Sequence, residues 1–208
     1  MSRALWLVRH GERQGETPPT EAATADRPHD QPLTERGRRQ ADLVADRLRD
    51  CGIGAVYASP FLCAAETAHL VAERLGLPVV VDRGLSELLT RERFDVAPSV
   101  LTARVLAERF ETVDPTHNSV TRPNYPETPD EAAERTCRTV RRLLANAPET
   151  VLFVGHELTV ASVVFGYTGQ ELTETPCASI TKLASYPWGW DIDRRVETTH
   201  LDALEGPS

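Results

Sequence analysis

The stretch Leu5-Trp6-Leu7-Val8-Arg9-His10-Gly11 decides the fold class. Its four consecutive apolar residues are typical of a strand that is buried on both faces, and they end at an arginine, a histidine and a glycine. A second stretch of this kind, Thr150 to Gly155, ends at His156. In α/β sheets the carboxyl ends of parallel strands share one edge, where ligands bind. His10 and His156 could therefore face one pocket.

Helical and extended patterns alternate along the rest of the chain. Apolar residues repeat at three- and four-residue intervals after Thr34, Ser59-Pro60 and Thr128-Pro129, which predicts helices over about 34–50, 60–75 and 128–144. We expect further strands at 53–58, 78–81, 179–185 and 190–196, and shorter helices at 100–110 and 158–165. This order predicts an α/β three-layer sandwich, with a mostly parallel central sheet flanked by helices.

We expect a single domain over residues 1–199, because a chain of 208 residues can bury one core of ordinary size. Residues 14–32 contain four prolines and no periodicity, so they should form a long loop. The periodic spacing of apolar residues also weakens over residues 88–127. This segment resembles a cap-like insertion over one face of the domain and would form much of the pocket rim. Residues 200–208 should be a loose tail.

Composition and charge argue against several classes of function. A net charge of −8 opposes non-specific binding to nucleic acid. The longest apolar stretches, such as 160–165, fall far short of the roughly 20 residues of a membrane span. Without the pattern of a secretory signal, a cytoplasmic location is the default expectation.

The four cysteines (Cys51, Cys63, Cys137 and Cys177) form no CxxC pair, so neither a zinc knuckle nor a redox motif is predicted. Nothing in the sequence indicates an oligomeric state.

Arg9-His10-Gly11-Glu12 resembles the RHG signature of the histidine phosphatase superfamily, also called the phosphoglycerate mutase-like family. The resemblance covers most of the chain, because further matching segments follow in order: Pro32-Leu33-Thr34 with Gly37, Gln40 and Ala41, then Ala58-Ser59-Pro60 with Thr67-Ala68, then Ser86-Glu87, and finally Val154-Gly155-His156. It implies a phosphatase that hydrolyses a phosphate monoester through a phosphohistidine intermediate. The substrate would be a phosphorylated small molecule or a phosphoprotein, and no cofactor is expected.

The residue types suit this chemistry. A neutral imidazole is a good nucleophile near neutral pH, because its unperturbed pKa is about 6.5, so His10 is the expected nucleophile. Arg9 can hold two phosphate oxygens with its planar guanidinium, and Gly11 lets backbone amides approach the same group. His156, if protonated, could donate to the equatorial oxygens. The resemblance implies that Glu87 protonates the leaving oxygen and then activates water.

One position departs from the pattern of the family. Cys63 stands where the family usually carries an arginine, so a pocket of two arginines and two histidines would lack one positive charge. Arg13, four residues after Arg9, is the candidate replacement. Glu12 and Glu157 complete the expected substrate-binding set with Arg9, Gly11, Arg13, Cys63 and His156.

Other functions stay open. The missing arginine is compatible with a catalytically weak family member that binds a phosphorylated ligand or a protein. A phosphoglycerate mutase is disfavoured, because mutases usually carry an asparagine shortly after RHGE, whereas this chain has Arg13-Gln14-Gly15-Glu16. A metal site is not expected, because neither HxH nor HExxH occurs. No motif specifies the substrate, although four arginines could meet an anionic one: Arg91, Arg93, Arg109 and Arg122.

Overall fold

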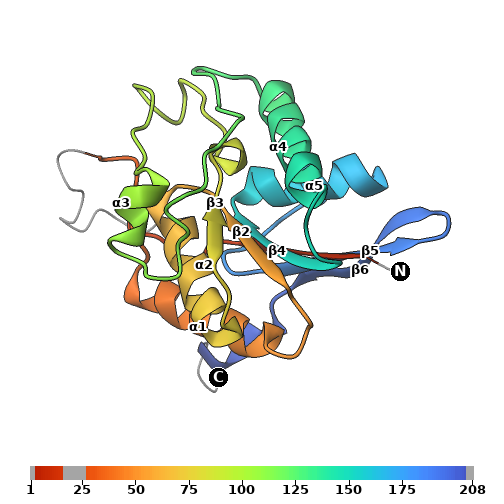
Figure 1. Ribbon diagram of the computed structural model, residues 1–208. Coiled ribbons are helices and arrows are strands. Elements are labelled where there is room, and N and C mark those ends of the chain that lie inside the picture. Colours follow the sequence, from red (N-terminus) through yellow and green to blue (C-terminus); the bar gives the residue numbers. More distant parts are fainter. Residues whose placement is uncertain (1–2, 16–26, 205–208) are drawn as a thin grey trace.

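The computed structural model describes residues 3–15 and 27–204. Within these residues, six strands form one sheet in the order β3-β2-β4-β1-β5-β6 (Figure 1). The parallel strands are β1 (Ala4–Arg9), β2 (Ala55–Ala58), β3 (Val79–Val81) and β4 (Thr150–Gly155). The antiparallel strands are β5 (Ile180–Tyr186) and β6 (Gly189–Glu197). The expected, mostly parallel sheet is confirmed, and its two antiparallel strands lie together at one edge.

Helices cover both faces of the sheet (Figure 1). The four longer ones are α1 (Glu35–Leu48), α2 (Leu62–Leu75), α4 (Pro129–Leu144) and α5 (Glu157–Thr168). Side chains of β1 alternate between two cores: Trp6 and Val8 pack with residues of α1 and α2, whereas Leu5 and Leu7 pack with residues of α4 and α5. Such alternation is what a strand buried on both faces requires. The three-layer sandwich is therefore confirmed.

The helix boundaries follow from their caps. Thr34 accepts a hydrogen bond from the Gly37 amide at the start of α1, and Thr128 forms a capping box with Glu131 at the start of α4. By contrast, α2 begins two residues later than expected, at Leu62, because Ser59 at the end of β2 turns the chain and accepts from the Phe61 amide.

The weakly patterned segment 88–127 lies against the β3 edge of the sheet. Its expected helix over 100–110 is reduced to α3 (Ala103–Ala107), because the following chain turns to pair Val113 with Val79. Leu106 anchors the segment in the core formed with α1 and α2. Part of the expected loop at 14–32 falls on residues 16–26 and lies outside the described residues. None of the described helices has both the length and the apolar character needed to cross a lipid bilayer.

The expectation of a loose tail is wrong for residues 200–204. They continue a 3-10 helix, η2 (Thr199–Leu204), which contacts α1. Leu201 packs against the core, and the Nε2 atom of His200 donates to the Ala178 carbonyl at 3.0 Å. A partly buried leucine and a satisfied carbonyl hold this segment in place, although its short apolar pattern carries no periodicity.

Candidate active site

The sheet brings two histidines together at one edge. Strands β1 and β4 are parallel neighbours with Arg9 opposite Gly155, so the next residue on each strand is a histidine. The backbone N–H of His10 donates to the Gly155 carbonyl at 2.9 Å. The rings of His10 and His156 lie 5.2 Å apart, and each residue is only 2% exposed. The juxtaposition expected from the strand ends is therefore present.

Both rings line a cavity of about 460 Å³, a size typical of sites for small molecules. Five further residues of the expected site also line it: Arg9, Arg13, Cys63, Glu87 and Glu157. They come from separate segments of the chain. The fold therefore gathers most of the expected set around one space.

The ring of His10 is oriented by its own backbone. Its Nδ1 atom lies 2.8 Å from the carbonyl oxygen of Gly11. A carbonyl oxygen only accepts hydrogen bonds, so Nδ1 carries the proton and the neutral ring keeps its lone pair on Nε2. The nitrogen that can act as a nucleophile is therefore Nε2.

His156 precedes α5 and is held from two sides. Its Nε2 atom lies 2.8 Å from the hydroxyl oxygen of Ser59, and its Nδ1 atom lies 3.6 Å from Glu87 Oε2. Burial, reinforced by the charges of Arg13 and Arg9, holds the pKa of His156 well below its usual value. Burial and these charges therefore favour the neutral ring. A neutral imidazole can still donate one N–H, because one of its two ring nitrogens keeps a proton.

Glu87 lies on the loop after the 3-10 helix η1 (Arg83–Leu85). Its Oε1 atom accepts from the amide of Leu88 at 2.8 Å, while Oε2 lies 3.1 Å from the guanidinium of Arg93. Oε2 is also the oxygen nearest His156. One carboxylate oxygen is thus fixed by the backbone and the other is directed to the cavity.

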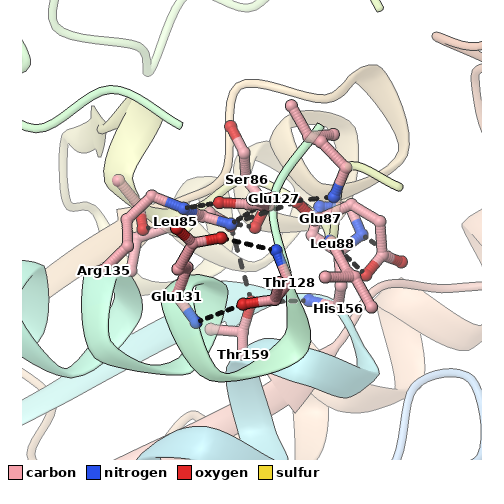
Figure 2. A network of polar contacts seen from close by, with 12 residues as sticks. Leu85, Ser86, Glu87, Leu88, Glu127, Thr128, Glu131, Arg135, His156 and Thr159 are labelled. Atoms are coloured by element: carbon pink, nitrogen blue, oxygen red, sulfur yellow. Dashed lines mark hydrogen bonds and ion pairs between the residues drawn. The ribbon is translucent and has the colours of Figure 1, made fainter. Parts of the chain in front are cut away.

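Arg135 of α4 holds the loop that carries Glu87 (Figure 2). Its guanidinium donates to the carbonyl oxygens of Gly84, Ser86 and Glu87 at 2.9 to 3.2 Å. It also binds both carboxylate oxygens of Glu127, at 3.0 and 2.6 Å. The side chains of Arg135 and Glu127 are 3% and 2% exposed. A buried ion pair therefore fixes the backbone next to the cavity.

Arg9 is itself positioned by neighbouring groups. It donates to the Thr175 carbonyl at 2.8 Å, and its Nη1 atom lies 3.8 Å from the carboxylate of Glu157. Glu157 is in the first turn of α5, with half of its side chain exposed. The guanidinium of Arg9 therefore lies between the loop before β5 and the start of α5, at the cavity wall.

Two further arginines line the cavity that Cys63 also lines. Cys63 is in the first turn of α2 and is 2% exposed. Arg13 lines the same cavity, and its charge contributes to lowering the pKa of His156. Arg93 also lines the cavity, whereas three other arginines that could meet an anionic substrate are exposed and lie outside its lining: Arg91, Arg109 and Arg122. The wall of the cavity that Cys63 lines thus carries cations from two separate segments.

Gly11 and Glu12 do not line the cavity. The amide of Gly11 donates to Thr67 at 3.1 Å, and a Cβ atom on Gly11 would lie 2.5 Å from the carbonyl oxygen of Gly37. The carboxylate of Glu12 accepts from the hydroxyl of Thr34 at 2.8 Å. Both residues therefore lie where the chain after β1 meets the start of α1, outside the cavity lining, and their expected contact with substrate stays a prediction.

Sequence reasoning gave no role to Ser59, Arg135 or Glu127. Ser59 follows a buried strand, as His10 and His156 do, so the same strand-end rule could have identified it. Arg135 occupies the buried face of an amphipathic helix, where an arginine needs a partner. Its partner Glu127 precedes that helix in an aperiodic segment, so no spacing connects the two.

A possible metal-binding cluster lies inside the same cavity. One ligand atom each from His10, Cys63 and His156 lies within 4.8 Å of the other two. Short sequence motifs did not indicate this cluster, because His10 follows β1, Cys63 lies in α2 and His156 follows β4, so that the three residues belong to separate segments.

Comparison with known proteins finds matches over nearly the whole chain. Residues 5–198 match the sequence profile of the histidine phosphatase superfamily (branch 1). A protein named probable phosphoglycerate mutase GpmB, from Cronobacter sakazakii, is 29% identical over 214 residues, which cover 96% of this chain and 95% of that protein.

Solved structures of phosphatases share this fold. The ecdysone phosphate phosphatase of Bombix mori, in complex with tungstate, has a TM-score of 0.70 with 22% identity and coverage of 94% of this chain and 93% of that one. A mycobacterial glucosyl-3-phosphoglycerate phosphatase has a TM-score of 0.66 with 22% identity and coverage of 95% and 100%. At these identities the likeness establishes the architecture.

Proposed function

The chain belongs to the histidine phosphatase superfamily, and on that basis we propose that it hydrolyses a phosphate monoester through a phosphohistidine at His10. One observation carries this proposal. The Nε2 lone pair of His10, a second imidazole and a carboxylate with one oxygen directed inward meet in a single cavity. These are the nucleophile, the hydrogen-bond donor and the proton carrier that a two-step phosphoryl transfer requires.

In the first step, Nε2 of His10 attacks phosphorus and the bond to the leaving oxygen breaks. A protonated Glu87 gives its proton to that oxygen, and the alcohol leaves. In the second step, Glu87 takes a proton from water, whose oxygen attacks phosphorus and breaks the P–N bond. Inorganic phosphate is released, and His10 and Glu87 return to their starting states.

Charge on the transferred group would be balanced by the surrounding donors. Arg9 and His156, which both line the cavity, would donate to the phosphoryl oxygens, and a bound phosphate would itself favour protonation of His156. We assign the role of the missing arginine to Arg13, with Arg93 as a second cation at the rim. Residues 88–127, which include Arg93 and Phe94 of the cavity wall, would then select the substrate.

A mutase is the second candidate, because a relative that spans nearly the whole chain is named as a probable phosphoglycerate mutase. The two activities share a phosphohistidine and differ in the acceptor. A phosphatase passes the group to water, whereas a mutase returns it to the other hydroxyl of its substrate. The phosphatases named among the solved structures act on a phosphorylated steroid and a phosphorylated sugar derivative, so phosphorylated small molecules are the first substrates to test.

The test of this function combines turnover with trapping of the intermediate. The protein is assayed for phosphate release from p-nitrophenyl phosphate and from a panel of sugar, amino-acid and steroid phosphates, and for interconversion of 2- and 3-phosphoglycerate. We expect phosphate release together with an acid-labile, base-stable adduct that peptide mass spectrometry places on His10. Interconversion without net phosphate release would establish the mutase instead. Binding of phosphate esters without turnover or adduct would identify a binding protein.

We expect Glu87→Gln to affect poor leaving groups most, because they need a proton as the bond breaks. On an alkyl phosphate, kcat should fall by roughly 100- to 1,000-fold. On p-nitrophenyl phosphate, whose leaving group needs little protonation, release of the first p-nitrophenolate should remain fast. Hydrolysis of the adduct should be slow, because its general base is lost. A burst followed by accumulated phosphohistidine is the signature to measure by rapid quench.

The matched control for this substitution is Glu92→Gln, which alters an exposed carboxylate five residues away. Its kinetics should match those of the wild type on both substrates. Equal losses on alkyl and nitrophenyl esters in Glu87→Gln, with no accumulated adduct, would remove Glu87 from the acid and base role.

A further inference from the structure

The cluster of His10, Cys63 and His156 joins two imidazoles and one thiol in a buried space. Each of the three residues is 2% exposed, and their ligand atoms lie within 4.8 Å of one another. Cys63 extends from the first turn of α2 toward the ends of β1 and β4, and all three line the cavity. The cluster is therefore accessible from the cavity to a small ion.

We propose that His10, Cys63 and His156 form a binding site for Zn²⁺ whose occupation blocks phosphoryl transfer, an inference that rests on the proposed phosphatase function. Imidazole nitrogen and thiolate sulfur are the preferred ligands of Zn²⁺. Three protein ligands with a fourth position left for water or substrate are the arrangement of open zinc sites. The cavity provides space for that fourth ligand.

The geometry needs only a modest adjustment. With bonds of about 2.0 to 2.1 Å to nitrogen and 2.3 Å to sulfur, ligand atoms around one tetrahedral ion lie roughly 3.3 to 3.6 Å apart. Side-chain rotations that bring the present atoms about an ångström closer would meet this condition. Nδ1 of His10 is bound to the Gly11 carbonyl, so the zinc bond falls on Nε2. A carbonyl at the other nitrogen is a common second partner of a zinc-bound histidine.

The charges around the cluster permit a cation but weaken its binding. Binding converts the Cys63 thiol to a thiolate and releases one proton to solvent, so the ligand set itself supplies one negative charge. Glu87 adds a carboxylate 3.6 Å from His156. Arg9, Arg13 and Arg93 oppose the ion, although Glu157 and Glu87 offset Arg9 and Arg93. An arginine at position 63 would remove the thiolate and add a further opposing charge.

Zinc and phosphohistidine would exclude each other. The same Nε2 lone pair of His10 forms either the bond to zinc or the bond to phosphorus. Zinc-loaded protein should therefore form no adduct, and protein already phosphorylated on His10 should bind no zinc at this site.

The metal site is tested with tag-free, reduced protein in phosphate-free buffer. One equivalent of Co²⁺ should produce a thiolate-to-cobalt charge-transfer absorption, and Zn²⁺ should displace it at one ion per chain. Cys63→Ser, or Cys63→Ala as a second variant, should abolish this absorption and weaken Zn²⁺ binding by about 100-fold or more. Loss of a group that only hydrogen-bonds to a metal ligand already costs about 10- to 100-fold in affinity. Cys51→Ser, outside the cavity, is the control and should retain both. An absorption that is missing in the wild type, or that persists in Cys63→Ser, overturns the proposal.

Inhibition is measured separately, with each protein compared with its own zinc-free rate. Zn²⁺ at one equivalent should suppress turnover and the His10 adduct in the wild type, and a chelator should restore both. Cys63→Ser should keep its zinc-free rate at the same Zn²⁺ concentration. Equal suppression in both proteins overturns the inhibitory role. If the wild type shows no phosphatase turnover at all, the proposed function fails, and the cobalt spectrum still decides the metal site.

Discussion

His10→Ala is expected to lower kcat by at least about 10,000-fold on every substrate the protein hydrolyses, because loss of a covalent nucleophile removes the whole two-step route. The phosphohistidine adduct should disappear with it. The measurement is initial-rate phosphate release, paired with acid-labile, base-stable labelling of the same preparation. His10→Gln, which keeps more of the side-chain volume, should show the same loss.

A cavity-lining histidine with no assigned role provides the control for this substitution. His29 lines the cavity, contacts Phe94 edge to face and pairs with Asp95 at 2.9 Å. His29→Ala should change kcat by less than about 10-fold, the scale of a positioning effect rather than of lost chemistry. If His10→Ala, folded and as stable as His10→Gln, kept a tenth of the wild-type rate, the covalent route would be refuted.

The strand ends explain why the two histidines could be paired from sequence. Unbroken apolar runs identified β1 and β4, and parallel strands in an α/β sheet end at one edge. The residue after each run, His10 or His156, then had to lie there. Adjacency of β1 and β4 was not encoded in this pattern, because strand order depends on how the crossover helices pack. The sheet order observed here makes the two strands direct neighbours.

Other parts of the site depend on contacts that no short pattern records. Gly11 was expected to bring its amide to phosphate, yet that amide is occupied by Thr67, which comes from α2. The sequence contains no feature that separates Arg93 from three other arginines of the same region. Its contact with Glu87 is what places it at the cavity. The η2 helix was missed for the same reason, since Leu201 is fixed by packing rather than by periodicity.

Arg135→Met is expected to lower the free energy of unfolding by roughly 3 to 5 kcal/mol, because it leaves the Glu127 carboxylate buried without its partner. The substitution also removes the donor to three loop carbonyls, at Gly84, Ser86 and Glu87. Urea unfolding followed by circular dichroism measures the change. Arg138→Met alters an exposed arginine on the same helix and should cost less than about 0.5 kcal/mol.

A second substitution separates the buried charge from the lost hydrogen bonds. Glu127→Gln keeps an oxygen that can accept from the Leu89 amide but removes the charge. Added to Arg135→Met, it should restore about 1 to 2 kcal/mol, because no uncompensated carboxylate is then buried. No recovery in the double variant would mean that the loop hydrogen bonds, rather than the ion pair, dominate the contribution of Arg135.

Arg135 should also influence catalysis through the loop that it holds, which makes it a positioning residue. Glu87 lies at the end of that loop, so a loosened loop should misplace the carboxylate without removing it (Figure 2). The folded Arg135→Met protein should therefore lose kcat mainly on alkyl phosphates, with KM little changed and p-nitrophenolate release largely kept. This leaving-group dependence should reproduce that of Glu87→Gln at smaller amplitude. A uniform loss on all esters would instead indicate general instability, because partial unfolding removes active protein regardless of the leaving group.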